Sequence, residues 1–285
     1  MAFIECDALT HVYLKDTPME TVALRDVTLR IDEGEFVALL GPTGSGKSTL
    51  VQHFNALLRP TAGTVRIGGV DLAASAADLQ AVRRQVGLLF QYPEHQLFEE
   101  TVAEDVAFGP RNMGLGAEEV RARVADALRA VGLDPATFGP RSPFSLSGGE
   151  MRRVAAAGVL AMSPKVLVLD EPAAGLDPRG KAEILGHFRA LHAERGITVV
   201  LITHDMDEAA ALARRVVVLD QGRVVMDGPV REIFGRAEQL TALGLGVPAV
   251  TDLVNRLRAR GLPVREDALT ADEARLAIRE ALGWS

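Results

Sequence analysis

The sequence has 285 residues, of which 48% are hydrophobic and 24% charged, and its formal net charge is −7. This composition is typical of a globular protein with one large domain, or one domain and a small appendage, and it excludes a chain-wide basic field that would collect nucleic acid. The single cysteine, Cys6, excludes an internal disulfide framework and a cysteine-based zinc site.

The N-terminal segment MAFIECDALT carries acids where a signal peptide would need an apolar run. No apolar stretch approaches the roughly 18–20 residues that a membrane span requires. We therefore expect a protein of a reducing compartment that is cytosolic or held at a membrane by a partner. Cys6 is expected to be a small, buried apolar residue.

Short strands are expected before the first glycine loop, because apolar residues there alternate loosely or form a compact run. Their expected ranges are 3–13, 22–31 and 35–40. The segment after the loop favours a helix from Ser48 to about Leu58, since a proline follows shortly afterwards and disfavours helix before it.

The loop GPTGSGKS matches the pattern G-x-x-x-x-G-K-[ST] between an apolar strand and a helix. Glycines allow backbone N–H groups to curl around phosphate oxygens, and the new helix points its positive end at the same anion. Lys47 is placed to reach the β- and γ-phosphates, and Ser48 to offer its hydroxyl to Mg²⁺. The residues assigned to nucleotide binding here are Gly41, Pro42, Thr43, Gly44, Ser45, Gly46, Lys47, Ser48 and Thr49.

The stretch QYPEHQLFEETVAEDVAFGP, at 91–110, combines apolar residues with acids and contains no Lys or Arg. Such a surface suits a cationic partner, because it avoids like-charge repulsion. The alternative is a solvated acidic loop on a helical subdomain. The acids are Glu94, Glu99, Glu100, Glu104 and Asp105.

The segment SLSGGE, at 145–150, indicates the start of a helix, because Ser147 and Glu150 have the spacing of a capping box. Gly148 and Gly149 expose backbone N–H groups at that start, which makes a second anion-binding helix terminus. One nucleotide does not need two such termini from one chain. We therefore expect a dimer in which this terminus closes over the γ-phosphate held by the other subunit.

Two short β-branched strands, at 166–170 and 198–203, flank a helix expected from Pro178 to Arg195, which predicts a βαβ unit in a parallel sheet. Asp170 ends the first of these strands and fits the magnesium-side carboxylate of a P-loop NTPase. Glu171 follows it and is placed to orient or deprotonate the attacking water. The alternative is that both acids only cap the next turn.

The character of the chain changes after about Gly235. Residues 249–260 favour a helix with one apolar face, and Thr270 and Glu273 have capping-box spacing before a last helix. The expected apolar face consists of Val250, Leu253, Val254 and Leu257. We expect an ATP-binding domain at 1–235, with a helical subdomain at about 91–160, and a tail at 236–285 that packs on the domain or serves dimerisation.

These motifs, in this order and over residues 1 to about 235, resemble the ATP-binding subunit of an ABC transporter. The resemblance implies an α/β P-loop NTPase core with an antiparallel β subdomain, a helical subdomain and a short C-terminal helical tail. It implies that Ser147, Gly148 and Gly149 contact ATP in trans. It also implies roles for four isolated residues: Gln91 near Mg²⁺ and water, Asp177 at the dimer interface, His204 at the γ-phosphate and Tyr13 stacked on adenine.

The stretch at 91–114, the N-terminal HVYLKDTPMETVALRDV and the tail segment VPAVTDLVNRLRARGLPV are similar to ATPase subunits of energy-coupling factor (ECF) transporters. One departure is Ala173, where many relatives carry Thr. The resemblance implies hydrolysis of ATP with Mg²⁺ at the cytoplasmic face of a prokaryotic membrane, for uptake of vitamins or transition-metal ions. The implied partners are a second ATPase subunit, identical or paralogous, a transmembrane scaffold subunit and membrane-embedded substrate-binding subunits.

For the scaffold subunit, the resemblance implies coupling helices with Ala-Arg-Gly motifs, whose arginines would meet the acids of 91–110. Pro93, Leu97 and Phe98 would then form an apolar groove for the helix body. A dedicated cobalt or nickel importer ATPase is the nearest alternative. A non-transport ABC protein is less favoured, because the chain has neither a long coiled coil nor a second cassette.

Overall fold

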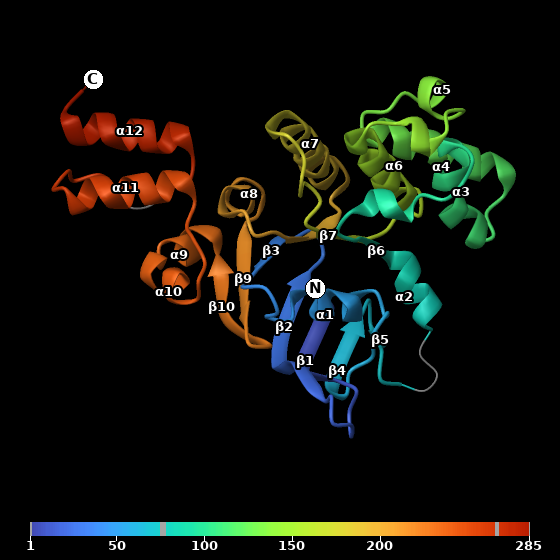
Figure 1. The fold of residues 1–285 in the computed structure, drawn as a ribbon, viewed down its shortest axis with the longest axis horizontal. Helices are drawn as coiled ribbons and strands as arrows, with labels where there is room; N and C mark the ends of the chain where they lie inside the picture. Colours follow the sequence, from blue (N-terminus) through green and yellow to red (C-terminus); the bar gives the residue numbers. More distant parts are fainter. Residues whose placement is uncertain (1, 75–77, 266–267, 285) are drawn as a thin grey trace.

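The computed structural model describes residues 2–74, 78–265 and 268–284, and its strands form two sheets (Figure 1). The strands are β1 (Ala2–Tyr13), β2 (Thr21–Asp32), β3 (Phe36–Leu40), β4 (Ala62–Ile67), β5 (Val70–Asp71), β6 (Val86–Leu89), β7 (Val166–Asp170), β8 (Thr198–Ile202), β9 (Arg215–Asp220) and β10 (Arg223–Pro229). One sheet has the order β2-β1-β4-β5 and the other β10-β9-β3-β8-β7-β6.

The helices are arranged around the two sheets. Those before β7 are α1 (Lys47–Phe54), α2 (Leu79–Gln85), η1 (Pro93–Gln96), α3 (Val102–Asn112), α4 (Ala117–Ala130), α5 (Pro135–Phe138), η2 (Pro143–Ser145) and α6 (Gly148–Leu160). Those after β7 are α7 (Pro178–Arg195), α8 (Met206–Leu212), α9 (Val230–Phe234), α10 (Ala237–Ala242), α11 (Ala249–Ala259) and α12 (Ala271–Leu282). This architecture confirms the predicted fold class.

The six-stranded sheet is parallel except for the edge pairing of β9 with β10. Its central strands β3 and β8 are buried along their whole length, as β-branched and aliphatic runs covered on both faces should be. Strand β7, helix α7 and strand β8 form the predicted βαβ unit. Because parallel strands end at the same edge, the loops after β3, β7 and β8 lie near one another, which positions the candidate site.

The antiparallel sheet shares a hydrophobic core with one face of the central sheet. Residues of β1 and β2, such as Ile4 and Leu29, belong to the same buried cluster as Leu39 of β3 and Phe54 of α1. Cys6 lies in this cluster, and burial raises the pKa of its thiol to about 12. The prediction that Cys6 is a buried apolar residue is confirmed.

Helices η1 to α6 form a separate layer between β6 and β7 in the chain, drawn in green in Figure 1. Helix α4 buries Val120, Val124 and Leu128, which recur at helical spacing, against this layer. The capping box at Ser147 and Glu150 is present. Helix α6 starts at Gly148, so Gly148 and Gly149 occupy its first turn.

Helix α1 ends at Phe54, four residues before the predicted end at Leu58. Asn55 closes the helix, and its side chain accepts a hydrogen bond from the backbone N–H of Leu57 at 3.3 Å. Ala56 takes a positive φ of 56°, which stops helical propagation. The turn closed by the Asn55 side chain, together with the left-handed Ala56, thus ends the helix before the proline does.

The tail is split between the main core and a small core of its own. Leu240 of α10 is buried in the large cluster of the central sheet and the helical layer. Helices α11 and α12, at the far left of Figure 1, pack on each other around Val254 and Ala274. The capping box predicted at Thr270 and Glu273 is present.

One predicted face position of α11 is wrong. Leu253 is 47% exposed, whereas Val254 is fully buried. Thr251 occupies the buried side instead, where its hydroxyl donates to the carbonyl of Ala268 at 3.1 Å. Thr251, whose hydroxyl has a backbone acceptor nearby, therefore takes a buried position on the face where Leu253 was expected. Within residues 2–74, 78–265 and 268–284 we find no helix whose length and hydropathy would suit a membrane span.

Candidate functional site

The loop between β3 and α1 has the backbone of a phosphate cradle. Gly41, Gly44 and Gly46 all have positive φ angles, of 148°, 79° and 102°. A Cβ atom on Gly41 would lie 2.2 Å from the carbonyl oxygen of Leu219, so glycine is required there for space as well as conformation. The glycines therefore let the loop curl around the start of α1, where the helix N-terminus suits an anion.

Lys47 folds back over this loop. Its Nζ donates to the carbonyls of Gly41 at 2.7 Å and Pro42 at 2.9 Å. Burial lowers the pKa of Lys47, while the nearby carboxylates of Glu171 and Asp170 oppose that shift. The ammonium group is thus held where the terminal phosphates of a nucleotide would meet the loop.

Ser48 and Asp170 come together at the carboxyl edge of the sheet. The Ser48 hydroxyl donates to Oδ2 of Asp170 at 3.3 Å. Burial raises the pKa of Asp170, and the hydrogen bond from Ser48 works against that rise. Mg²⁺ is commonly held by one or two carboxylates together with substrate phosphates, so this hydroxyl–carboxylate pair fits its preferred donors.

Glu171 is the centre of a second cluster. Gln91 donates from Nε2 to Oε2 of Glu171 at 3.1 Å, and Nδ1 of His204 lies 3.1 Å from Oε1. Glu171 has a positive φ of 50°, a conformation that costs a non-glycine residue energy and is found most often at functional sites. The structure therefore brings Glu171, predicted to act on the attacking water, together with Gln91, expected near Mg²⁺ and water, and His204, expected at the γ-phosphate.

Tyr13 lies at the end of β1 and reaches the phosphate-binding side. Its side chain is 37% exposed, and its hydroxyl lies 3.2 Å from Oγ1 of Thr49 in the first turn of α1. An exposed aromatic ring beside the phosphate loop suits base stacking. This exposure also places Tyr13 outside the hydrophobic core.

The signature segment, residues 147–150, does not line the same cavity as the Gln91–Glu171–His204 cluster. Ser147 and Gly149 line a cavity of about 290 Å³ together with Asp177. Gln91, Glu171 and His204 line another of about 350 Å³. Leu176 is the residue common to both linings. A phosphate held beside Glu171 therefore lies in a different cavity from this chain's own signature segment.

Ser147 and Asp177 both cap helices. The Ser147 side chain accepts from the backbone N–H of Glu150, and hydrogen bonds from Ser147 lower the pKa of the Glu150 carboxyl. Asp177 accepts from the N–H of Gly180 at 3.0 Å and so fixes the start of α7. The two caps fix the starts of α6 and α7, and Ser147 and Asp177 line the same cavity.

A network beside His204 was missed from the sequence. Lys181 forms an ion pair with Asp205, and its Nζ lies 2.9 Å from Oε1 of Glu208, which is 8% exposed. Thr203 donates to the same Glu208 carboxylate at 2.5 Å. These contacts tie the start of α7 to the loop that carries His204. In the sequence, Asp205 is a residue of the N-cap type that stands ahead of a helix. This was the one signal that could have indicated the network.

Arg152 is a second missed residue. It is 4% exposed and lies on α6, where Nε and Nη2 donate to Glu94 at 3.2 and 3.0 Å. Its Nη1 donates to the carbonyls of Pro172 at 3.3 Å and Ala174 at 2.5 Å. One buried guanidinium thus joins the signature helix, helix η1 and the loop that follows Glu171. No local sequence pattern indicates which groups Arg152 contacts.

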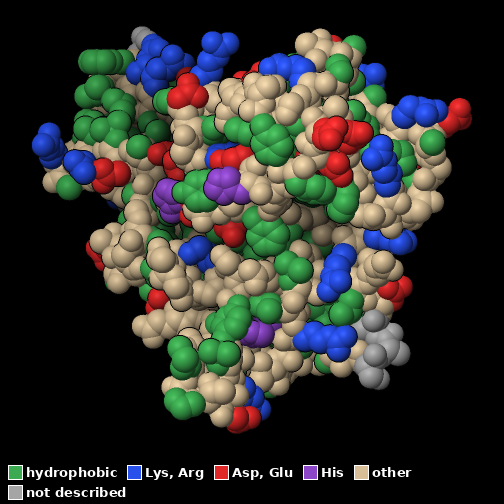
Figure 2. Space-filling view, turned by 45° about the vertical axis from the view of Figure 1, so that its right-hand side comes forward, with side chains coloured by type: hydrophobic (Ala, Val, Ile, Leu, Met, Phe, Trp, Pro, Cys, Tyr) green, Lys and Arg blue, Asp and Glu red, His purple; other side chains and the backbone are tan. Residues whose placement is uncertain are grey.

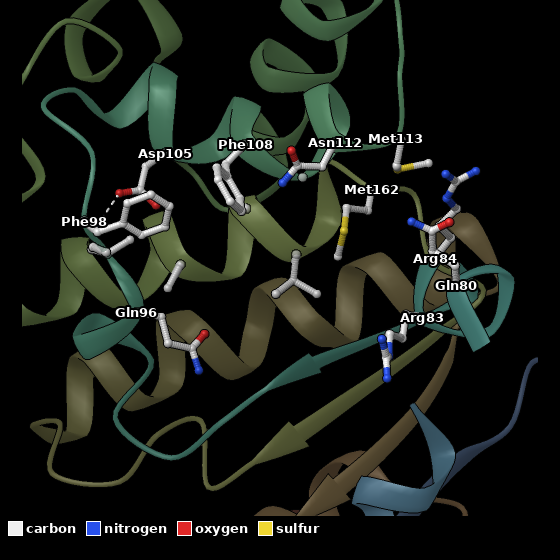
Figure 3. Close-up of a pocket in the computed structure, with 15 residues that line it drawn as sticks. Gln80, Arg83, Arg84, Gln96, Phe98, Asp105, Phe108, Asn112, Met113 and Met162 are labelled. Atoms are coloured by element: carbon white, nitrogen blue, oxygen red, sulfur yellow. Dashed lines mark hydrogen bonds between the residues drawn. The ribbon is translucent and has the colours of Figure 1, made fainter. Parts of the chain in front are cut away.

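A groove of about 360 Å³ lies between α2, η1, α3 and α6 (Figure 3). Phe98 and Phe108 form an edge-to-face pair in it, with ring centroids 4.9 Å apart, and are 57% and 45% exposed. Figure 3 shows Phe98 and Asp105 at one end of the groove and Arg84, Gln80 and Met113 at the other. The groove therefore has its aromatic pair beside Asp105 at one end and the basic side chains of α2 at the other.

The groove differs from the expected acidic surface in two ways. Glu94 is already paired with Arg152, and Oδ2 of Asp105 accepts the backbone N–H groups of Phe98 and Glu99 at 2.9 and 3.0 Å. Glu104 accepts from the Thr101 hydroxyl within its own helix cap. Three of the five acids are thus engaged inside the chain, because capping and ion pairing satisfy them locally.

The second difference concerns cations. The stretch 91–110 has no Lys or Arg, but α2 brings Arg83 and Arg84 to the groove from earlier in the sequence. Leu97 lines the groove as expected, whereas Pro93 is buried and does not. On the face drawn in Figure 2, hydrophobic side chains alternate with small groups of acidic and basic ones.

Comparisons with known proteins show the family of the chain. The family model described as ABC transporter matches residues 24–174. Proteins named energy-coupling factor transporter ATP-binding protein EcfA2 are similar along the chain. That of Symbiobacterium thermophilum is 57% identical over 97% of this chain and 95% of its own length. That of Clostridium perfringens is 48% identical over 98% of both.

Two solved structures have the same fold. CbiO1 from Clostridium perfringens, part of the ABC transporter complex CbiONQ, matches with a TM-score of 0.75 and 37% identity, covering 85% of this chain and 94% of that one. The ATP-binding cassette MJ0796, solved as a dimer in a post-hydrolysis state with ADP and Pi, matches with a TM-score of 0.71 and 33% identity. It covers 80% of this chain and 99% of that one.

Proposed function

Because the chain belongs to the ABC transporter family, and within it to the ATP-binding subunits of energy-coupling factor transporters, we propose that it hydrolyses ATP at sites shared with a second ATPase subunit. The observation that supports this most is the Gln91–Glu171–His204 cluster next to the Ser48–Asp170 pair. The chain's own signature segment lines another cavity, so a partner's segment would have to cover the phosphate.

In this proposal, ATP binds to the loop at 41–48, with Lys47 at the terminal phosphates and Tyr13 against the adenine. Bound Mg²⁺, held by Ser48 and Asp170 with Gln91 nearby, would neutralise charge on the β- and γ-phosphates. Ser147, Gly148 and Gly149 of the second subunit close over the γ-phosphate, and Asp177 contributes to the interface. Glu171 then takes the proton of an attacking water, while His204 holds the γ-phosphate side.

The groove at α2, η1, α3 and α6 is the proposed docking site for a cytosolic helix of the transmembrane subunit. Its exposed rings supply the apolar contact. Glu99 and Glu100 follow Phe98 directly in the chain, half-buried and exposed, and would meet cationic residues of that helix beside the groove. Gln91 precedes this segment directly, so movement of the helical layer would reach the catalytic cluster. The subunit would therefore work at the cytoplasmic face of the membrane.

We divide the chain into an ATP-binding domain at 1–235, with a helical subdomain at about 91–160, and a tail at 236–285. The tail is proposed to stabilise the ATPase dimer. Leu253 and Leu276 are 47% and 53% exposed on α11 and α12, which leaves apolar surface for a partner. The proposed cargo is a vitamin or a transition-metal ion. A dedicated cobalt or nickel importer ATPase stays the second candidate, because the ATPase subunit does not itself touch the cargo.

The docking proposal is tested by reversing charge and polarity in the groove. We expect Glu99→Arg/Glu100→Arg and, independently, Phe98→Glu to abolish co-purification with membrane subunits, while ATPase activity of the isolated subunits persists. Leu57→Asp is the control, because Leu57 is 49% exposed but does not line the groove. Unchanged assembly of both Phe98→Glu, in the groove, and Glu99→Arg/Glu100→Arg, beside it, would refute the docking site. The co-purified subunits and uptake assays would identify the cargo.

A further inference from the structure

Two buried histidines lie beneath the proposed adenine site and have no part in the chemistry above. His11 of β1 is 7% exposed and His53 of α1 is fully buried. Their rings meet edge to face, with centroids 4.9 Å apart and an interplanar angle of 78°. Imidazoles are expensive to bury, so their placement needs a reason beyond filling space.

Each ring is fixed by a hydrogen bond to a backbone carbonyl. Nδ1 of His11 lies 3.1 Å from the oxygen of Arg59, and Nδ1 of His53 lies 2.8 Å from the oxygen of Thr49. A carbonyl only accepts, so both Nδ1 atoms carry the proton. Burial lowers the pKa of His53 to about 4, and this ring is neutral at ordinary pH.

The pair connects the two ends of the proposed nucleotide site. His11 meets the ring of Tyr13 edge to face, with centroids 4.6 Å apart. Tyr13 in turn touches the hydroxyl of Thr49, whose carbonyl is held by His53. Tyr13, His11, His53 and Thr49 therefore form a closed ring of contacts between β1 and α1.

We propose that His11 and His53 are positioning residues for nucleotide binding, which set the Tyr13 ring at a fixed height and tilt relative to the phosphate loop. The proposal rests on the function above, in which Tyr13 stacks on adenine. Stacking is sensitive to ring orientation, and a flat imidazole edge restricts the tyrosine more than a flexible aliphatic side chain would. The histidine pair thereby fixes the position of Tyr13, at the adenine end of the site, relative to the loop at the phosphate end.

The test compares ATP with inorganic tripolyphosphate, which lacks the base, by calorimetric titration in Glu171→Gln protein that does not turn over. Edge-to-face contacts are of a size that predicts a loss of about three- to tenfold in ATP affinity for His11→Leu and for His53→Leu. Tripolyphosphate affinity should be unchanged. His11→Phe, which keeps a flat ring, should retain most of the ATP affinity.

A double substitution separates a positioning role from a general one. If His11 acts through Tyr13, then Tyr13→Leu/His11→Leu should bind ATP no more weakly than Tyr13→Leu alone. Additive losses, or equal losses for ATP and tripolyphosphate, would overturn the proposal. If His53→Leu does not fold, the His11 variants carry the test.

The outcome also distinguishes this inference from the proposed function. Normal ATP affinity in His11→Leu, together with weakened affinity in Tyr13→Leu, would overturn the inference and leave the adenine site standing. Normal affinity in Tyr13→Leu would remove the adenine-stacking role itself and the histidine proposal with it.

Discussion

Asp170 and Glu171 are neighbours in sequence, yet their side chains serve different clusters. Asp170 accepts from Ser48, while Glu171 is held by Gln91 and His204. The division arises where the strand ends, because Glu171 leaves the extended conformation and takes a φ of 50°. Two adjacent carboxylates thereby gain separate surroundings, which suits one for a metal and the other for a proton.

This division predicts distinct losses for two amide substitutions. Glu171→Gln should lower kcat by about 10²–10⁴-fold, because it removes the proton acceptor, and should leave ATP affinity nearly unchanged. Asp170→Asn should instead weaken binding of the magnesium–ATP complex. Phosphate-release assays and nucleotide titration measure the two effects. Turnover at the wild-type rate in Glu171→Gln would contradict the assignment of the base.

Helix α6 is the element that joins the separate parts of the molecule. Its start carries the signature glycines, and Arg152, in its second turn, binds Glu94 of η1 and the loop after Glu171. Burial disfavours ionisation of Glu94, but the hydrogen bond from Arg152 outweighs this and holds the pKa of Glu94 below its ordinary value. A shift of α6 would therefore move both the docking segment and the catalytic loop.

The Arg152–Glu94 pair predicts a non-additive stability effect. Arg152→Met should lower the free energy of unfolding by about 3–5 kcal/mol, because it leaves Glu94 without its buried counter-ion. Adding Glu94→Gln should recover part of this loss, since the unpaired charge is gone. Urea unfolding of the two single variants and the double variant measures the coupling. A double variant as unstable as the sum of the singles would show that the pair has no mutual role.

The sequence predicts the elements well where the pattern is local. The phosphate loop, the βαβ unit and both capping boxes depend on residues close together in the chain, and all are present. Arg152 and Glu94 are 58 residues apart, so no periodicity could show that this acid is already paired. The same holds for His11 and His53, which only the packing of β1 on α1 brings together.

At the scale of the whole molecule, the chain presents two half-sites that line separate cavities. The cluster at Gln91, Glu171 and His204 lies beside the phosphate loop, while Ser147 and Gly149 line a second cavity with Asp177. The helical layer and helices α11 and α12 lie toward opposite ends of the central sheet (Figure 1). Closure of two subunits would complete both sites together and leave the groove free for a membrane partner.

The most direct test asks which subunit's nucleotide this chain's signature segment covers. In the complex with its second ATPase subunit, Gly149→Asp is introduced into this chain alone, and photoreactive ATP is trapped with vanadate. If the subunits are identical, a size tag marks the unsubstituted one. We predict that trapped label disappears from the second subunit and persists on this chain. Loss of label from this chain, with the second subunit still labelled, would contradict the shared-site account.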